Sequence, residues 1–438
     1  MTVIHRGQAL KGEFTVNPDR EMLVCALALG ALARGRTLLE ECPATPVSNN
    51  FAEWLHENGV SLQHKSNAWE IEGVGLQWNS SPLQTLPKNF FAKFIALCIL
   101  SRDHETCFDF GTQTAEDGTE ALLQEHFQGS WQNSRWLFGE VDLKVRISPS
   151  GEVPHLSKIR LLLQAIVHER SLYIEEKTSC RDQLSSMLTY FGAPLTVEQS
   201  GQEEMDELAR RMARLQGQKQ DRKTLTKLAA CKFLTGKDYF VPGDPTEATA
   251  LTLQASLLPD SSITIRNICL NPSRAGAFNA LKRMGAELEV VQKKERFGDQ
   301  FGSLRVQSCK RMVGRKMTSE LLLSCLEEIP LLAVAACLAE GETILRLPEH
   351  VAAEQRVLLD CLAANLKLAG IEVGVYEEGL VVRGREEVDA NAFTYEKPAA
   401  LGLAFAVLAR VAHGQSDLSQ LEPLQNEYPG LLEKLGVA

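Results

Sequence analysis

The sequence lacks the features that mark membrane, secreted and disulfide-bonded proteins. No apolar run reaches the ~18 residues of a membrane span. Residues 1–10 are polar and charged where a signal peptide would be apolar, so we expect a cytoplasmic protein that is not bound to membranes. The 11 cysteines include no C-x-x-C pair, and most lie in apolar contexts. We therefore expect a protein of a reducing compartment, in which cysteines serve as small core residues. These are Cys25, Cys98, Cys325, Cys337 and Cys361.

Metal-binding and nucleic-acid-binding patterns are missing as well. His56-Glu57 and His168-Glu169 have no second histidine four residues on, so we expect no zinc site. The formal net charge of −10 argues against a nucleic-acid binder, whose surface would be basic. The same charge gives a poor background field for an anionic substrate, so any anion site would have to be built from local groups.

The composition that remains is that of an ordinary globular protein, with 44% hydrophobic and 23% charged residues. Its length suits two domains of about 200 residues each. The stretch Val241–Val290 combines turn residues, an apolar helix, a half-buried strand, a helix closed by glycine and a second strand. The expected segments are Pro242–Pro245, Thr246–Leu258, Ser262–Arg266, Ala275–Met284 with Gly285, and Glu287–Val291.

This order of helices and strands recurs along the chain. A small-residue helix leading into a strand is predicted at Leu27–Glu41, Leu161–Glu176, Leu331–Leu347 and Leu403–Ser419. A helix closed by glycine is predicted before Gly59, Gly192, Gly285, Gly370 and Gly436, and a less regular copy lies between Leu86 and Phe138. Copies of ~60–80 residues are longer than solenoid repeats, so we expect a domain-sized α/β unit repeated about six times.

Several motifs in this pattern carry a family resemblance. Val241–Val290 contains VPGD, ITIRN, LNPSR and LKRMGAELEV, and Glu327–Gly341 reads EEIPLLAVAACLAEG. Two further segments, Glu13–Gly35 and Ser179–Ala193, stand in the same order and spacing as the matching motifs of a known family. Together these segments resemble the 5-enolpyruvylshikimate-3-phosphate synthase family over nearly the whole chain.

The resemblance implies a two-domain inside-out α/β barrel with three βαβαββ units in each domain, helices inside and sheets outside. The first domain would span residues 20–239, and the second would join residues 1–19 to 240–438. The family transfers the enolpyruvyl group of phosphoenolpyruvate to a hydroxyl of shikimate 3-phosphate without a metal or organic cofactor. We expect a monomer whose helix N-termini, with Lys and Arg side chains, bind these anions in a cleft.

The family's first motif is altered here. Where the family has a lysine-serine pair and a later arginine, this chain has Arg20, Glu21 and Cys25. Arg20 keeps a cation, but an arginine does not release a proton at neutral pH as a lysine can. Glu21 places a negative charge where the family has a phosphate-binding serine.

Other first-domain motifs are reduced in the same way. Lys93 is expected as a substrate-binding cation, and Phe90, Phe91 and Phe94 beside it are expected as core residues. The family's phosphoenolpyruvate-binding arginine falls on or beside Gly118, next to Glu116 and Asp117. The run Ser157-Lys158-Ile159-Arg160 offers Arg160 as a cation but no glutamine, and Arg181-Asp182 keeps the family's Arg-Asp pair.

Residues 199–237 are expected as a charged insertion relative to the family. Met205, Leu208, Met212 and Leu215 fall at helical spacing, which predicts an amphipathic helix. Such a helix could bind a partner or cover the cleft, or it could be a solvated decoration. The simpler decoration is the preferred interpretation.

In the second domain, the resemblance assigns the acid–base role to Glu327, with Glu328 beside it. Arg20, which keeps a cation in the first motif, is the second candidate catalytic residue. Arg274 in the intact Asn271–Arg274 motif, Arg356 and Lys397 are the further candidate substrate-binding residues, and the family's second-domain lysine is absent from Val351–Leu358. Near the C-terminus, the family's lysine before a Phe-Pro pair is replaced by Asn426-Glu427-Tyr428-Pro429.

Two hypotheses follow. The first is an enolpyruvyl transferase with weak activity or an altered acceptor, and the second is a catalytically silent relative that binds a ligand or a protein. Losing one charged hydrogen bond to an anion costs ~1.5–3 kcal/mol, so three lost cations would weaken binding by roughly three to six decades. The acidic balance and the lack of a basic stripe argue against a third class, the RNA-end-processing relatives of this repeated unit.

Overall fold

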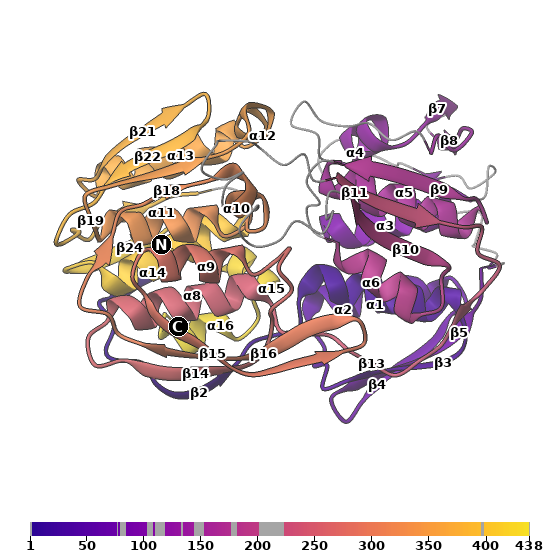
Figure 1. Ribbon diagram of the computed structural model, residues 1–438, viewed down its shortest axis with the longest axis horizontal. Helices are drawn as coiled ribbons and strands as arrows, with labels where there is room; N and C mark the ends of the chain where they lie inside the picture. Colours follow the sequence, from indigo (N-terminus) through magenta and orange to yellow (C-terminus); the bar gives the residue numbers. More distant parts are fainter. Residues whose placement is uncertain are drawn as a thin grey trace. The chain divides into compact units, whose positions relative to one another are not determined.

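The structure is a computed structural model that describes residues 2–76, 78, 85–102, 108–109, 119–132, 135–143, 153–176, 182–200, 223–395 and 398–437. The chain divides into two compact units (Figure 1). Unit 1 comprises Met1–Arg20 and Pro242–Ala438, and unit 2 comprises Glu21–Val241. The chain therefore begins in unit 1, forms the whole of unit 2 and then returns.

Unit 1 repeats one order of elements: a central helix, a strand, an outer helix and a hairpin. The first copy is α8 (Pro245–Leu257), β14 (Ser262–Cys269), α9 (Gly276–Arg283), β15 (Glu287–Arg296) and β16 (Asp299–Gln307). The second is α11 (Ile329–Cys337), β19 (Ala339–Glu340), β20 (Glu342–Arg346), α12 (Glu349–Glu354), α13 (Arg356–Leu368), β21 (Glu372–Tyr376) and β22 (Gly379–Arg383). Between them lie β17 (Met312–Val313), β18 (Lys316–Met317) and α10 (Ser319–Leu323).

The third copy of unit 1 uses both ends of the chain. It contains β23 (Ala392–Phe393), α14 (Ala399–Val411), β24 (Gln415–Leu418), α15 (Glu422–Glu427) and α16 (Leu431–Leu435). The N-terminal strand β1 (Thr2–His5) pairs antiparallel with β24, with Ile4 opposite Ser416. The next strand, β2 (Lys11–Thr15), pairs parallel with β14 and ends the sheet ordered β15-β16-β14-β2.

Three buried helices form the centre of unit 1. Every residue of α11 is buried, as are all of α8 up to Ser256 and most of α14, because a helix that is apolar or small on all faces can only lie inside a core. These helices contact one another, and the sheets β18-β20-β22-β21 and β15-β16-β14-β2 lie against them. On α14, Gly402 makes room for the ring of Tyr395, whose hydroxyl donates to the Gln420 carbonyl over 2.6 Å.

Unit 2 shows the same order of elements three times. The first copy is α1 (Arg20–Leu32), β3 (Ala33–Glu40), α2 (Pro46–Glu57), β4 (Ser61–Lys65) and β5 (Ala68–Val74). The second is α3 (Phe90–Leu100), β6 (Phe108–Asp109), α4 (Thr119–His126), β7 (Gly129–Gln132) and β8 (Arg135–Phe138). The third is α5 (His155–Val167), β9 (Leu172–Glu176), α6 (Gln183–Tyr190), β10 (Leu195–Ser200) and β11 (Lys223–Leu228), followed by β12 (Leu234–Thr235) and β13 (Tyr239–Phe240).

Central helices and outer sheets recur in unit 2. Helices α1, α3 and α5 are buried along most of their length, and α3 packs against α5. The sheets are ordered β12-β3-β5-β4, β6-β8-β7 and β10-β11-β9. Both units therefore have helices inside and sheets outside, which is the fold class that the sequence predicts.

Two expectations from the sequence need correction in unit 2. Phe91 and Phe94 are core residues, but Phe90 is 53% exposed because it occupies the first turn of α3, where a side chain can point away from the core. Lys223–Leu228, expected inside an insertion, forms the central strand β11 of its sheet. The predicted amphipathic helix around Met205–Leu215 lies outside the described residues.

In the described part of the chain, no helix combines the length and the hydropathy that a membrane span needs.

Candidate active site

The candidate site in unit 1 is centred on Arg20, whose guanidinium is held by three carboxylates. Its Nε donates to Asp244 Oδ2 over 3.0 Å, its Nη2 donates to Glu327 Oε2 over 3.2 Å, and its Nη1 donates to Glu427. The Tyr428 ring lies 4.4 Å from the Arg20 guanidinium carbon. Because the planar guanidinium has a fixed fork of donors, this arrangement uses each of its nitrogens.

The turn before α8 positions Asp244. Asp244 caps α8, with Oδ1 accepting from the amides of Thr246 over 2.7 Å and Glu247 over 3.3 Å, and Pro245 occupies the first helical position. This explains why the turn sequence starts a helix here: the cap satisfies free backbone donors and proline has no amide to lose. The other carboxylate oxygen, Oδ2, is left to face Arg20.

Arg274 is the second cation of this site and is almost fully buried, at 1% exposure. Its Nη2 lies 3.1 Å from Asp19 Oδ2 and 3.7 Å from Glu327 Oε2, and its Nη1 lies 3.8 Å from Glu328 Oε1. Glu328, at the start of α11, also accepts from the Thr246 hydroxyl over 2.5 Å. Arg274 therefore joins the start of α11 to the segment before α1.

We call the residues linked by these contacts the charge cluster: Arg20, Arg274, Asp19, Asp244, Glu327, Glu328 and Glu427. Five carboxylates meet two guanidinium groups in it. Its electrostatic balance is negative, so an incoming anion would meet repulsion as well as the loss of existing ion pairs.

A sixth carboxyl group, that of Glu247, lies next to the charge cluster. Glu247 Oε2 accepts from the Asn17 amide over 3.0 Å and Oε1 accepts from Asn17 Nδ2 over 2.9 Å. Asn17 Nδ2 also donates to the Pro429 carbonyl over 2.7 Å. Burial and the nearby charge of Asp244 raise the pKa of Glu247 to about 7. Asn17 thus ties the segment before α1 both to α8 and to the segment after α15.

Unit 2 holds a separate set of buried charged groups. Lys158 Nζ contacts Glu176 Oε1 over 2.5 Å and Asp182 Oδ1 over 3.1 Å. Burial opposes the charge of Lys158, but the carboxylates of Asp182 and Glu176 outweigh it and raise the pKa of this lysine. At the start of α5, His155 Nε2 lies 2.8 Å from Glu21 Oε2, so Glu21 faces an imidazole.

The two other candidate cations of unit 2 are also engaged. Lys93, 3% exposed, donates from Nζ to the Thr119 hydroxyl over 2.7 Å. Arg160 Nη1 donates to Gln164 Oε1 over 2.7 Å and to the Asp142 carbonyl over 3.2 Å. Each is therefore tied to neighbouring polar groups of its own unit.

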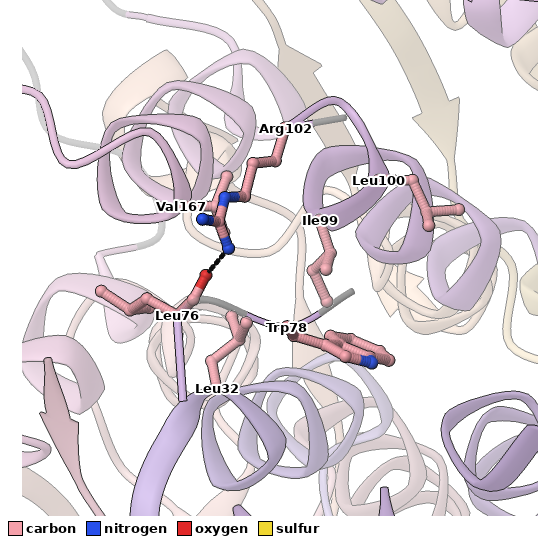
Figure 2. A pocket seen from close by; sticks show the side chains of 7 residues that line it. All are labelled: Leu32, Leu76, Trp78, Ile99, Leu100, Arg102 and Val167. Carbon is pink, nitrogen blue, oxygen red and sulfur yellow. Dashed lines mark hydrogen bonds between the residues drawn. The ribbon is translucent and has the colours of Figure 1, made fainter. Parts of the chain in front are cut away.

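Figure 2 shows a small cavity in unit 2 between α1, α3 and α5. Leu32, Leu76, Trp78, Ile99, Leu100 and Val167 line it with Arg102, which points to the Leu76 carbonyl and donates to it. Its volume of about 10 Å³ suits about one water molecule, far less than a phosphorylated sugar-like ring needs. Within the described residues, no group of three or more His, Cys, Asp or Glu is placed to hold a metal ion.

Comparison with known proteins identifies the family. The family model described as EPSP synthase (3-phosphoshikimate 1-carboxyvinyltransferase) matches residues 155–435, which is more than half of the chain. The chain belongs to the EPSP synthase family.

Curated EPSP synthases align with the chain over almost its full length. The 3-phosphoshikimate 1-carboxyvinyltransferase of Synechococcus sp. (strain CC9605) is 26% identical over 450 residues, covering 98% of this chain and 96% of the relative. That of Synechococcus sp. (strain WH7803) is 29% identical over the same length and coverage.

Solved structures of the family share the fold. The structure of EPSP synthase from Acinetobacter baumannii superposes with a TM-score of 0.76 at 18% identity, covering 99% of this chain and 97% of that one. The enolpyruvyl transferase NikO from Streptomyces tendae gives a TM-score of 0.69 at 15% identity, covering 99% and 96%. At this identity the likeness establishes the two-domain α/β architecture and nothing finer.

Three of the seven site residues that the EPSP synthase resemblance suggested lie together in unit 1. Arg20, Arg274 and Glu327 share the charge cluster, with Glu327 Oε2 facing both arginines. Arg356 does not join them through any contact found in the described residues: it lies exposed on α13 and pairs with Asp360 over 3.0 Å. Lys93 and Arg160 belong to unit 2, and Lys397 lies outside the described residues.

Sequence reasoning missed Glu427 and Tyr428 as the partners of Arg20. They are 407 and 408 residues away in sequence, and a single sequence does not reveal such a contact. One signal was present, because the family's lysine-serine and lysine-phenylalanine motifs are altered in Arg20-Glu21 and Glu427-Tyr428 together. A changed cation at one end of the chain and an added acid at the other are consistent with a new pair.

Proposed function

We propose that this member of the EPSP synthase family transfers the enolpyruvyl group from phosphoenolpyruvate to shikimate 3-phosphate weakly or not at all. The observation that carries this proposal is the engagement of Arg20, which takes the place of the family's lysine, by Asp244, Glu327 and Glu427. To bind an anion, Arg20 would have to give up charged hydrogen bonds that are worth about 1.5–3 kcal/mol each.

Glu327 is the proposed acid–base residue, but its carboxylate is already engaged. Its Oε2 accepts a hydrogen bond from Arg20 and lies 3.7 Å from Arg274, so a substrate hydroxyl would have to compete with these two cations for it. Any residual transfer would use Glu327 for proton movement and Arg20 as the cation beside it. Lys93, Arg160, Arg274, Arg356 and Lys397 are the proposed substrate-binding residues in that case.

The alternative function is that of a catalytically silent family member that binds a ligand or a protein. The negative balance of the charge cluster favours this alternative over an enzyme of doubly anionic substrates. An active transferase and a silent relative would have the same fold. They would differ in whether they bind and consume phosphoenolpyruvate.

The test is a thermal-stability titration with phosphoenolpyruvate and shikimate 3-phosphate, separately and together, combined with an assay for released phosphate. A ligand at 100 times its dissociation constant stabilises a protein by about 2.7 kcal/mol, which shifts the melting temperature by several degrees. We expect no such shift at sub-millimolar ligand and phosphate release far below that of an active EPSP synthase measured in parallel. Turnover comparable to that enzyme would overturn the proposal.

A gain-of-binding variant sharpens the test. Asn426→Lys with Glu427→Gln adds a cation and removes one carboxylate partner of Arg20. If the loss of positive charge is what weakens substrate binding, this variant should bind phosphoenolpyruvate at least about tenfold more tightly than the unmodified chain. The control Arg383→Gln with Glu372→Gln removes an exposed ion pair between β21 and β22 and should leave binding unchanged.

A further inference from the structure

Helix α13 packs one face into the core of unit 1. Leu359, Leu362, Ala363 and Leu366 on this face are each at most 3% exposed, and the helix contacts β21 beside it (Figure 1). Asn365 secures the flank of the helix next to Cys361, because its Nδ2 donates to the Thr394 carbonyl over 2.9 Å and its Oδ1 accepts from the Thr394 amide over 2.9 Å. The rotation of α13 about its axis is therefore fixed.

The opposite face of α13 is apolar although it faces outward. Val357 is 81% exposed, Leu368 is 62% exposed, Ala364 is exposed and Cys361 is half-buried. At 100° per residue these four side chains fall within about 60° of one another, opposite the buried face. Cys361, expected as a core residue, is only half-buried: it packs against the core of unit 1, with its Sγ 3.9 Å from the Thr394 carbonyl, and lies at the border of this stripe. A surface helix ordinarily carries polar residues on its outer face.

The spacing of these four residues is that of a helix–helix contact. Val357, Cys361, Ala364 and Leu368 follow one another at intervals of four, three and four residues, which is the pattern of core positions in a two-helix pair. Asp360 and Lys367 lie one residue before Cys361 and Leu368, on the same edge of the stripe. In an antiparallel pair, positions of this kind from the two helices lie opposite each other.

We propose that α13 is a self-association surface, on which a second copy of this chain docks with its own α13 antiparallel. In that register Val357 of each copy faces Leu368 of the other, and Cys361 faces Ala364, so the larger side chains meet at the two ends of the contact and the smaller ones at its centre. Asp360 of each copy faces Lys367 of the other, which gives two ion pairs related by the two-fold axis. A parallel arrangement would lose both of these ion pairs.

The charges on the helix favour a copy of itself over an unrelated partner. An isologous contact requires a surface that complements itself, and the single opposite-charge pair Asp360 and Lys367 meets this condition in one orientation only. Asp360 already pairs with Arg356 over 3.0 Å on its own helix, so it is held extended along this edge.

The dimer is expected to be weak and concentration-dependent. The helix has 13 residues and is about 20 Å long, so its outer face alone buries less than the ~1,200 Å² of stable specific interfaces. We expect a monomer at low micromolar concentration and a growing dimer fraction at hundreds of micromolar. This inference is independent of whether the chain is an active enzyme.

The first test measures the molar mass of the full chain by sedimentation equilibrium across that concentration range. Val357→Arg places a charge in each half of the symmetric contact and should raise the dimer dissociation constant at least about tenfold. Val290→Arg is the matched control, because Val290 is also an exposed valine of unit 1, on β15, and should leave self-association unchanged. Equal effects of the two variants, or no dimer at any concentration, would overturn the proposal.

The second test determines orientation with thiols and charges. Ala364→Cys places a thiol opposite Cys361 of the other copy, so mild oxidation should give a disulfide-linked dimer whose linked peptides contain residues 361 and 364. Ala364→Cys with Cys361→Ser should lose this product, whereas a parallel pair would retain a 364–364 link. Asp360→Lys should weaken the dimer and Asp360→Lys with Lys367→Asp should restore it. Crosslinking that survives Val357→Arg would contradict the proposal.

Discussion

At the scale of single residues, the two arginines of the charge cluster form ion pairs with carboxylates of their own unit. Arg20 and Arg274 share Glu327 as a partner and are otherwise held by different acids, Arg20 by Asp244 and Glu427, Arg274 by Asp19 and Glu328. Breaking a buried pair of this kind by removing one partner is strongly destabilising. The same groups that would serve an anionic substrate therefore contribute to folding.

Glu247 should make stability depend on pH. Its pKa is raised from 4.5 to about 7, so the folded chain holds a proton that the unfolded chain releases between these values. This contribution is present below pH 4.5 and is lost as the pH rises through about 7, by at most about 3 kcal/mol. We expect Glu247→Gln to flatten the decline of the urea-unfolding free energy between pH 6 and 8.

Asp299→Asn is the control for this prediction. Burial raises the pKa of Asp299 from 3.8 to about 6, so its share of stability is lost at a lower pH than that of Glu247. Asp299→Asn should flatten the decline below pH 6 and leave the slope above it. A Glu247→Gln variant with the slope of the unmodified chain between pH 6 and 8 would show that Glu247 is ionised in the folded state.

The sequence could predict the residue types of the charge cluster but only part of its contacts. Arg20, Arg274 and Glu327 stand in recognisable motifs, so their proximity could be expected from the family resemblance. The contacts of Glu427 and Tyr428 with Arg20 depend on tertiary packing of the two chain ends, for which a single sequence gives no distance. Their roles in catalysis and binding stay predictions.

At the scale of elements, the buried helices depend on small residues at defined positions. A Cβ added at Gly402 of α14 would lie 2.2 Å from Cζ and 2.5 Å from Oη of Tyr395. We expect Gly402→Ala to displace the ring and its hydrogen bond to Gln420, lowering the unfolding free energy by about 2–3 kcal/mol. Chemical denaturation measures this loss.

The matched control for Gly402 is Gly30 in α1. A Cβ there would lie 2.8 Å from Cδ1 of Ile71, which is the end of a flexible side chain and can move. Alanine also favours a helix over glycine by ~1 kcal/mol, so Gly30→Ala should change stability much less. If both variants lose the same free energy, the contact with Tyr395 is not the cause of the loss at Gly402.

The first residue of a helix could be predicted where a local interaction such as capping determines it. Asp244 and Pro245 predict the start of α8, and the helix begins at Pro245 because capping is a local interaction. Phe90 was misassigned because the apolar run Phe90–Leu100 is buried on nearly every face, and its sequence does not show which end residue points outward. The two-residue strands, such as β17 and β18, have too few residues for a periodic signal.

At the scale of the whole molecule, unit 2 is a continuous piece of chain and unit 1 is not. Residues 21–241 contain three complete copies of the repeated order, with buried helices and their own sheets. We expect this segment, expressed alone, to unfold cooperatively in urea with protected amides in α1, α3 and α5, as measured by hydrogen exchange.

Residues 242–438 alone should be much less stable, because β24 and β14 would lack their partner strands β1 and β2. Joining residues 1–20 to them through a flexible linker should restore cooperative unfolding, since the lost strand pairs are then supplied again. A stable fragment 242–438 with no gain from residues 1–20 would contradict this expectation.

The pairing of β1 with β24 also has a consequence for synthesis on the ribosome. The first strand emerges early, but its partner ends at Leu418, after all of unit 2 and most of unit 1 have been translated. At ~5–20 residues per second, β1 waits on the order of 20–80 seconds for its partner. Throughout that interval the edge of β1 is unpaired, so the third copy of unit 1 is completed only after Leu418 has been translated.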